Sequence, residues 1–197
     1  MGIQVKIGVS NKHIHLCEAD IAVLFGAGYR LRPKKGLQLP GEFASEEVVD
    51  VAGPKGTLKN VRLVGPAFKE SQVELALTDA RAIGLSPPVR ESGILDDTPG
   101  VRLIGPNGKV NLSRGVIAAL RHIHISAPQA LEAGLKDKDL ANVRTFGSRP
   151  LIFQNVLVRI GDVSLTEFHV DTDEANAAGL KNGDFAEIIG NDPEPLR

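Results

Sequence analysis

Short hydrophobic stretches run along most of the chain, and turn-forming residues separate them. Val and Ile recur in these stretches, and Gly, Pro, Asn or Asp bound each one, which is typical of short β-strands. The predicted strands span residues 5–10, 46–53, 59–66, 100–106, 155–170 and 185–190. A mainly β fold is therefore expected.

Helical patterns are fewer and shorter. Residues 79–85, 127–135 and 173–180 each carry an acidic residue or a proline near the start and a glycine where a helix would stop. We expect short helices that cap a β-rich core.

An internal repeat is visible in the order of these patterns. Residues 13–15 and 122–124 both read His-Ile-His within a predicted strand, and each pair is followed by a predicted short helix. Residues 53–66 and 105–115 share a Gly-Pro turn followed by a charged loop. Duplication of a β-rich unit explains both observations and predicts two small barrels or sandwiches. Turn-forming residues are dense over 85–106, where we expect the linker.

Composition narrows the class of protein. With 197 residues and 42% hydrophobic content the chain can bury a core, and 23 basic against 24 acidic residues give a net charge of -1. This balance argues against binding nucleic acid or an anionic membrane through overall charge. There is no signal-peptide pattern and no segment of roughly 20 apolar residues, so we expect a soluble, unexported protein. The single cysteine excludes an internal disulfide, which fits a reducing cytosol.

All five histidines fall in three places: His13 with His15, His122 with His124, and His169 alone. Residues i and i+2 of a strand point to the same face, so each pair can offer two imidazoles to one ion such as zinc. One such pair alone is as often a polar strand face. Two pairs at repeat-equivalent positions favour a metal site, whereas His169 alone would be an ordinary surface or core histidine.

Two further side chains are candidates for the same chemistry. Glu74 lies in an apolar, strand-like run and could complete a metal site, although a glutamate facing solvent on an edge strand is the alternative. Cys17 follows His15 by two residues and could be a ligand or an acyl-accepting thiol, but a buried inert thiol is the favoured interpretation.

Nucleophile and nucleotide motifs are absent from the sequence. There is no G-x-S-x-G elbow, no Walker phosphate loop and no G-x-G-x-x-G fingerprint, so covalent catalysis has little support. Basic residues gather over 30–35 and again as Arg144, Arg149 and Arg159. These clusters suit phosphate groups, although ordinary surface charge is the alternative.

Several motifs together resemble one family. They are Ser10–Leu16 (SNKHIHL), Pro40–Phe43 (PGEF), Gln72–Glu74 (QVE), Gly115–Ile117 with Arg121–His124 (RHIH), and His169–Asn176 (HVDTDEAN). In this order and over nearly the whole chain, they resemble the signatures of the PduL family, the phosphate propanoyltransferases of bacterial microcompartments.

The resemblance implies a fold and a metal site. The fold is mainly β, with two small β-barrel domains capped by short α-helices. Residues 1–12 plus 120–197 would form one domain and residues 13–119 the other, with the active site between them. Two zinc ions are implied. His13 and His15 would hold the ion nearer the coenzyme A sulfur. The other ion would be held by Glu74, His122, His124 and His169. Together these six residues would form the catalytic site.

The resemblance also implies a reaction. Propionyl-CoA or acetyl-CoA and inorganic phosphate would give acyl phosphate and CoA, reversibly, by direct attack of phosphate. We expect Lys34, Lys35, Arg149 and Asn176 to bind the coenzyme's phosphates. Partners would be acyl-CoA, CoA, phosphate and a microcompartment shell or partner enzyme, with neither nucleic acid nor membrane. We expect a homo-oligomer in the bacterial cytoplasm, inside a microcompartment.

Two departures from the family pattern leave alternatives open. The family usually carries an arginine in its Gly-Pro-x-Arg segment, where this chain has Phe68, so Lys69 or another basic residue would have to bind phosphate or turnover would be weak. The amphipathic N-terminal extension of some relatives is also not seen. One alternative is a zinc-dependent acyl-CoA hydrolase. Another is a metal-stabilised, non-catalytic microcompartment module, whose metal sites would be closed.

Overall fold

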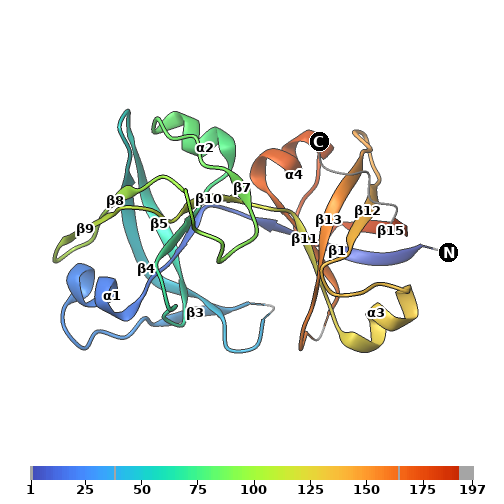
Figure 1. Ribbon diagram of the computed structural model, residues 1–197, viewed down its shortest axis with the longest axis horizontal. Helices are drawn as coiled ribbons and strands as arrows, with labels where there is room; N and C mark the ends of the chain where they lie inside the picture. Colours follow the sequence, from blue (N-terminus) through green and yellow to red (C-terminus); the bar gives the residue numbers. More distant parts are fainter. Residues whose placement is uncertain (1, 38, 164, 191–197) are drawn as a thin grey trace. The chain divides into compact units, whose positions relative to one another are not determined.

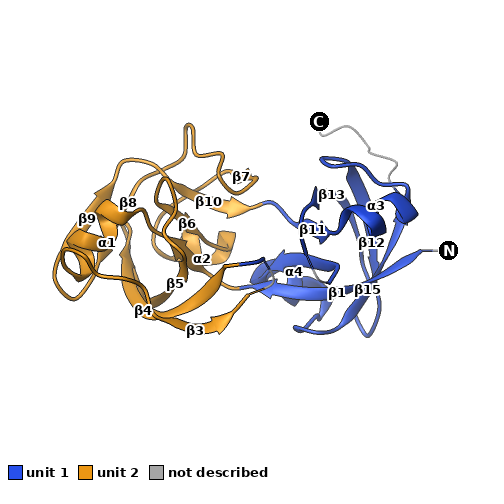
Figure 2. Ribbon diagram, turned by 90° about the horizontal axis from the view of Figure 1, so that it is seen from below, with its two compact units in different colours: residues 1–10, 38–40, 120–197 blue, residues 11–37, 41–119 orange. Residues whose placement is uncertain are grey.

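The computed structural model describes residues 2–37, 39–163 and 165–190. The chain divides into two compact units (Figure 2): unit 1 comprises residues 1–10, 38–40 and 120–197, and unit 2 comprises residues 11–37 and 41–119. The predicted domains, residues 1–12 plus 120–197 and residues 13–119 with the active site between them, stay a prediction.

The prediction of a linker over residues 85–106 is wrong. These residues lie inside unit 2, where they form turns around the short strands β7 (Val89–Arg90) and β8 (Val101–Ile104). The chain instead passes between the units after Ser10, on either side of residues 38–40, and before Leu120. Proline and glycine are dense over 85–106 because the chain turns repeatedly within one unit there.

Unit 1 is a closed six-stranded barrel (Figure 1) in the order β1-β14-β11-β13-β12-β15. Its core is apolar, with Phe168, Ile7 and Ile123 fully buried. Helices α3 (Ala127–Ala133) and α4 (Thr172–Ala178) both end at a glycine in the left-handed conformation, as their sequence pattern predicts. The strands are β1 (Ile3–Ser10), β11 (His122–Ile125), β12 (Leu140–Thr145), β13 (Ile152–Ile160), β14 (Glu167–Asp171) and β15 (Phe185–Gly190).

Unit 2 is a curled half-barrel with its own apolar core, in which Ile14, Leu63 and Leu103 are fully buried. Its strand order is β7-β10-β6-β2-β5-β4-β8-β9, with β3 paired to β4. Besides β7 and β8, the elements are β2 (His13–His15), α1 (Glu18–Phe25), β3 (Pro33–Gly36), β4 (Phe43–Ala52), β5 (Thr57–Gly65), β6 (Gln72–Glu74), α2 (Leu77–Ala82), β9 (Lys109–Leu112) and β10 (Val116–Ala119). Strands take 44% and helices 15% of the structure, which confirms the predicted mainly β class.

The predicted duplication is visible in the strand pairing. In unit 2, β2 lies between β5, which is parallel to it, and β6, which is antiparallel. In unit 1, β11 lies between β13 and β14 with the same two directions. The strand that precedes each His-x-His segment joins the other unit, since β1 runs parallel to β14 and β10 runs parallel to β6. The two His-x-His strands, β2 and β11, therefore occupy equivalent positions in the sheets of their units.

One predicted strand is divided in the structure. Residues 155–170 are expected as one strand, but they fall in β13 and β14, which are separated near Gly161 and both pair with β11. Strand β12 carries the sequence LANVRT and was not predicted, because its alternation of polar and apolar residues is too short to be recognised.

The described part of the chain contains no helix that is long and apolar enough to cross a membrane.

Candidate metal centres

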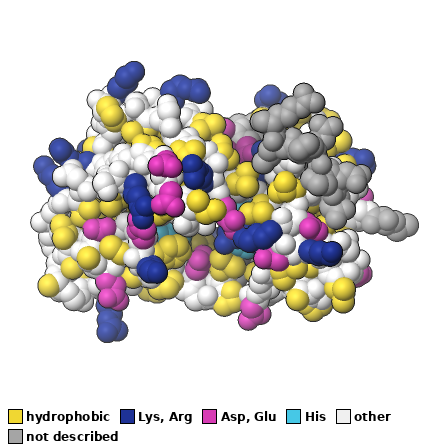
Figure 3. Space-filling model, viewed as in Figure 1, with side chains coloured by type: hydrophobic (Ala, Val, Ile, Leu, Met, Phe, Trp, Pro, Cys, Tyr) yellow, Lys and Arg dark blue, Asp and Glu magenta, His cyan; other side chains and the backbone are white. Residues whose placement is uncertain are grey.

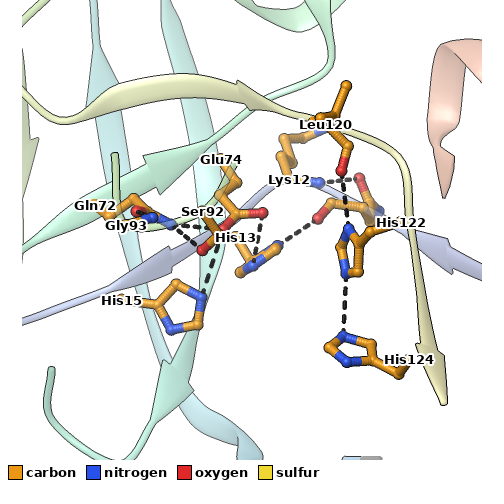
Figure 4. Close-up of polar contacts among 11 residues, drawn as sticks. Lys12, His13, His15, Gln72, Glu74, Ser92, Gly93, Leu120, His122 and His124 are labelled. Atoms are coloured by element: carbon orange, nitrogen blue, oxygen red, sulfur yellow. Dashed lines mark hydrogen bonds and ion pairs between the residues drawn. The ribbon is translucent and has the colours of Figure 1, made fainter. Parts of the chain in front are cut away.

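Unit 2 brings His13, His15 and Glu74 together. His13 and His15 lie on β2, and the antiparallel register of β2 and β6 places Glu74 directly opposite His13. The Glu74 Oε2 atom is 3.5 Å from His13 Nε2, and its Oε1 atom is 3.9 Å from His15 Nε2 (Figure 4). His15 and Glu74 are buried, so the three potential ligands face one another in a setting shielded from water.

Unit 1 brings His122, His124 and His169 together in the same way. The register of β11 and β14 places His169 opposite His122, and His122 Nε2 lies 3.1 Å from His124 Nε2 (Figure 4). Gly8 of β1 lies opposite His169 on its other side. A Cβ atom at Gly8 would come within 2.6 Å of His169 Cδ2, so glycine leaves the space that the imidazole occupies.

The first histidine of each pair is oriented by its own strand. The Nδ1 atom of His13 lies 2.8 Å from the carbonyl oxygen of Asn11, and that of His122 lies 2.8 Å from the carbonyl oxygen of Leu120. A carbonyl can only accept, so Nδ1 carries the proton and donates in both rings. The Nε2 lone pair of each ring is thereby directed at the other members of its group. In metal sites, a hydrogen bond from the other ring nitrogen commonly orients a histidine ligand in this way.

A basic residue anchors the start of each histidine strand. Lys12 Nζ lies 3.2 Å from both carboxylate oxygens of Asp79 on α2, the helix that follows β6. Arg121 Nη1 lies 2.9 Å from Glu174 Oε1 on α4, the helix that follows β14. In each unit the ion pair ties the strand carrying the histidine pair to the helix that follows the third ligand.

Burial lowers the pKa of three of the histidine rings. It is the main cause that lowers the pKa of His15 from 6.5 to about 4, and the nearby His13 adds to it. Burial, with His169 and Arg159 close by, lowers the pKa of His124 to about 3. The pKa of His122 is lowered well below its usual value, again mainly by burial. Neutral imidazoles have the lone pair that a metal ion requires, so these groups suit metal binding at neutral pH.

The lowered pKa of His15 gives a testable effect on stability. Its pKa of about 4 in the folded protein lies below the value of 6.5 expected after unfolding. The unfolded chain therefore binds the extra proton first, and we expect the metal-free protein to lose stability as the pH falls from 6.5 towards 4. The contribution of His15 is on the order of 3 kcal/mol.

Urea unfolding of chelator-treated protein at several pH values in this range measures that loss. His15→Gln removes the titrating ring, so its stability should fall less steeply with pH than that of the unaltered protein. Parallel curves for the two proteins would contradict the assignment to His15.

The ligand sets fit a catalytic metal. Among the residues that the structure describes, one group offers two histidines and a glutamate, and the other offers three histidines, with the ligand atoms of each group within 4.8 Å of one another. Three protein ligands of these kinds are typical of catalytic zinc, which keeps a fourth position open, whereas structural zinc has four.

Glu74 contacts the histidine pair of its own unit. Its carboxylate lies near His13 and His15, and the strand register makes Glu74 the equivalent of His169, since each faces the first histidine of its own unit. That Glu74 holds an ion with His122, His124 and His169, as the resemblance implies, stays a prediction.

The residues expected to bind coenzyme A lie on exposed positions. Lys34 and Lys35 are exposed on β3, and Asn176 is exposed on α4. Arg149 packs beside Gly179, the residue that ends α4, so Arg149 and the helix bearing Asn176 are neighbours in unit 1. Basic and acidic side chains are interspersed on the face seen in Figure 3, in keeping with the net charge of -1.

Several other side chains lie close to the two groups. Cys17 Sγ lies 3.4 Å from Asp20 Oδ2, a contact that leaves it outside the histidine group. Phe68 stacks on His15, with ring centroids 3.9 Å apart and an interplanar angle of 19°. Ser92 hydrogen bonds to Glu74, and Glu167 contacts His169. Sequence reasoning missed these contacts, although Glu167 and His169 are two residues apart on one strand and therefore share a face.

Comparison with known proteins identifies the family. The model of the phosphate propanoyltransferase family matches residues 6–181. The chain belongs to this family. It is 51% identical to the phosphate propanoyltransferase of Thermotoga maritima over 186 residues, which cover 94% of this chain and 89% of that protein. It is 48% identical to the one from Rhodopseudomonas palustris over 185 residues (94% and 82%), and 47% identical to the one from Salmonella typhimurium over 188 residues (94% and 89%).

Membership in the phosphate propanoyltransferase family confirms the resemblance found from the motifs and makes this protein an acyltransferase. The match spans both units, so both histidine groups lie within the part of the chain that the family model covers.

Proposed function

We propose that this phosphate acyltransferase converts propionyl-CoA or acetyl-CoA and inorganic phosphate to acyl phosphate and CoA, and that it uses one zinc ion at each histidine group. The observation that carries the proposal is the pair of three-ligand groups at equivalent sheet positions. Each set leaves room for a substrate atom on the ion, which a closed structural site would not.

The reaction needs no nucleophile from the protein. An oxygen of phosphate attacks the thioester carbonyl carbon, the C–O bond forms, and the C–S bond breaks as the thiolate leaves with its electron pair. The reverse reaction follows the same path. Zinc bound at these groups would supply Lewis acidity that stabilises the thiolate and polarises the acyl carbonyl.

The protein's own residues prepare the site for this chemistry. His13 and His122 are held by backbone carbonyls, and the low pKa values of His15 and His124 keep these rings neutral at the pH of the cell. Phe68 presents an apolar ring against His15. That the two ions act on one substrate molecule rests on the resemblance to the family.

The coenzyme A contacts, the acyl groups and the assembly are proposals too. Lys34, Lys35, Arg149 and Asn176 are proposed to bind the phosphates of coenzyme A, for which exposed cationic and amide groups are suited. One methylene discriminates by only about 1–3 kcal/mol, so both acyl groups are proposed as substrates. We propose a homo-oligomer that works inside a bacterial microcompartment.

Release of CoA from propionyl-CoA tests the function. The assay compares metal-replete and chelator-treated protein, each with and without phosphate. We expect release that requires phosphate and is lost on chelation, with recovery when zinc is returned. Release without phosphate would instead identify a hydrolase. A metal-replete protein that releases no CoA, with or without phosphate, would favour the non-catalytic module.

A further inference from the structure

Gln72 is a buried polar residue whose side chain is fully engaged. It is 1% exposed. Its Oε1 atom accepts a hydrogen bond of 2.7 Å from the backbone N–H of Gly93. Its Nε2 atom donates to Glu74 Oε1 at 2.6 Å and to Ser92 Oγ at 2.8 Å (Figure 4). A buried amide with such partners has one orientation, because the carboxylate can only accept.

Ser92 completes a clamp on one oxygen of Glu74. Its hydroxyl accepts from Gln72 and donates to Glu74 Oε1 at 2.9 Å. Glu74 Oε1 therefore receives two hydrogen bonds, which stop the carboxylate from turning. The other oxygen, Oε2, is left facing His13 Nε2 at 3.5 Å.

Unit 1 has a polar side chain, Glu167, at the position equivalent to Gln72 of unit 2. Gln72 lies opposite His15 in the register of β2 and β6, and Glu167 lies opposite His124 in the register of β14 and β11. Glu167 Oε2 contacts His169 Nε2 at 2.7 Å. In both units, a polar residue two positions before the third member of the group contacts that member directly.

We propose that Gln72 and Ser92 are positioning residues that fix the Glu74 carboxylate through Oε1, so that Oε2 faces His13. The inference rests on the proposed metal function. A ligating carboxylate that is hydrogen bonded in its outer shell needs little reordering when the ion binds, and losing such a partner typically weakens metal affinity about 10–100-fold.

Titration of metal-free, full-length protein with Co²⁺, followed by its absorption spectrum, tests this inference. We expect Ser92→Ala to weaken one of two binding equivalents about 10–100-fold and to change its spectrum, while the other equivalent is unchanged. Ser92→Thr keeps the hydroxyl and should restore the affinity. Gln72→Asn keeps the amide but shortens its reach, and should weaken the same equivalent.

Ser45→Ala provides the matched control. Ser45 is a buried serine of the same unit whose hydroxyl donates to the carbonyl oxygen of Glu47 at 3.2 Å, so its loss affects stability alone. Unaltered protein that bound no Co²⁺ would refute the metal proposal and this inference together. The positioning role alone would be refuted if Ser92→Ala bound both Co²⁺ equivalents as tightly as the unaltered protein. It would also be refuted if Ser45→Ala weakened Co²⁺ binding as much as Ser92→Ala does.

Discussion

Replacing His122 and His124 together by alanine is expected to remove one of two zinc equivalents and to lower kcat on the order of 1,000-fold. The two rings supply the Nε2 atoms that lie 3.1 Å apart, and His169 alone cannot hold an ion tightly. Losing a catalytic metal removes several kcal/mol of transition-state stabilisation, and about 4 kcal/mol corresponds to a factor of this size. Zinc content by elemental analysis and the rate of phosphate-dependent CoA release measure the two effects.

The matched control is Gln4→Ala with Gln154→Ala, which truncates two exposed strand side chains of the same barrel. It should retain both zinc equivalents. His169→Ala should lose the same equivalent as the histidine pair, since the three rings form one group. Full zinc content and full activity in the double histidine variant would contradict the proposed mechanism.

Replacing Phe68 by arginine is expected to lower the KM for phosphate about 10–100-fold. Phe68 lies half-buried against His15 and offers no hydrogen-bond donor to an anion. A guanidinium at this position could donate two hydrogen bonds to phosphate, and a hydrogen bond to a charged group contributes about 1.5–3 kcal/mol. The KM for phosphate at saturating propionyl-CoA is the measurement that checks it.

Phe68→Leu separates charge from shape in this experiment. It removes the ring that stacks on His15 but adds no cation, so it should not lower the KM for phosphate. Lys69→Ala tests whether the neighbouring exposed lysine binds phosphate in the present protein. If the KM for phosphate rose in Phe68→Arg while the zinc content stayed normal, phosphate would have to bind elsewhere.

Local patterns in the sequence were sufficient for the secondary structure and the histidine pairs. Strand and helix patterns act over a few residues, so the mainly β class and the helices ended by glycine were predictable. His-x-His places two rings on one strand face whatever the fold, because side chains alternate along a strand. The repeat of this pattern gave the duplication, which the strand pairing confirms.

Only the tertiary structure decided which side chains complete each group. Glu74 belongs with His13 because β2 and β6 pair in one register, and a shift by one residue would turn its carboxylate to the other face. Ser92 reaches Glu74 from a loop, and Phe68 stacks on His15 from the segment after β5. The linker predicted at 85–106 failed for a related reason: turn-forming residues mark where a chain bends, but only long-range packing determines which side of a bend belongs to which unit.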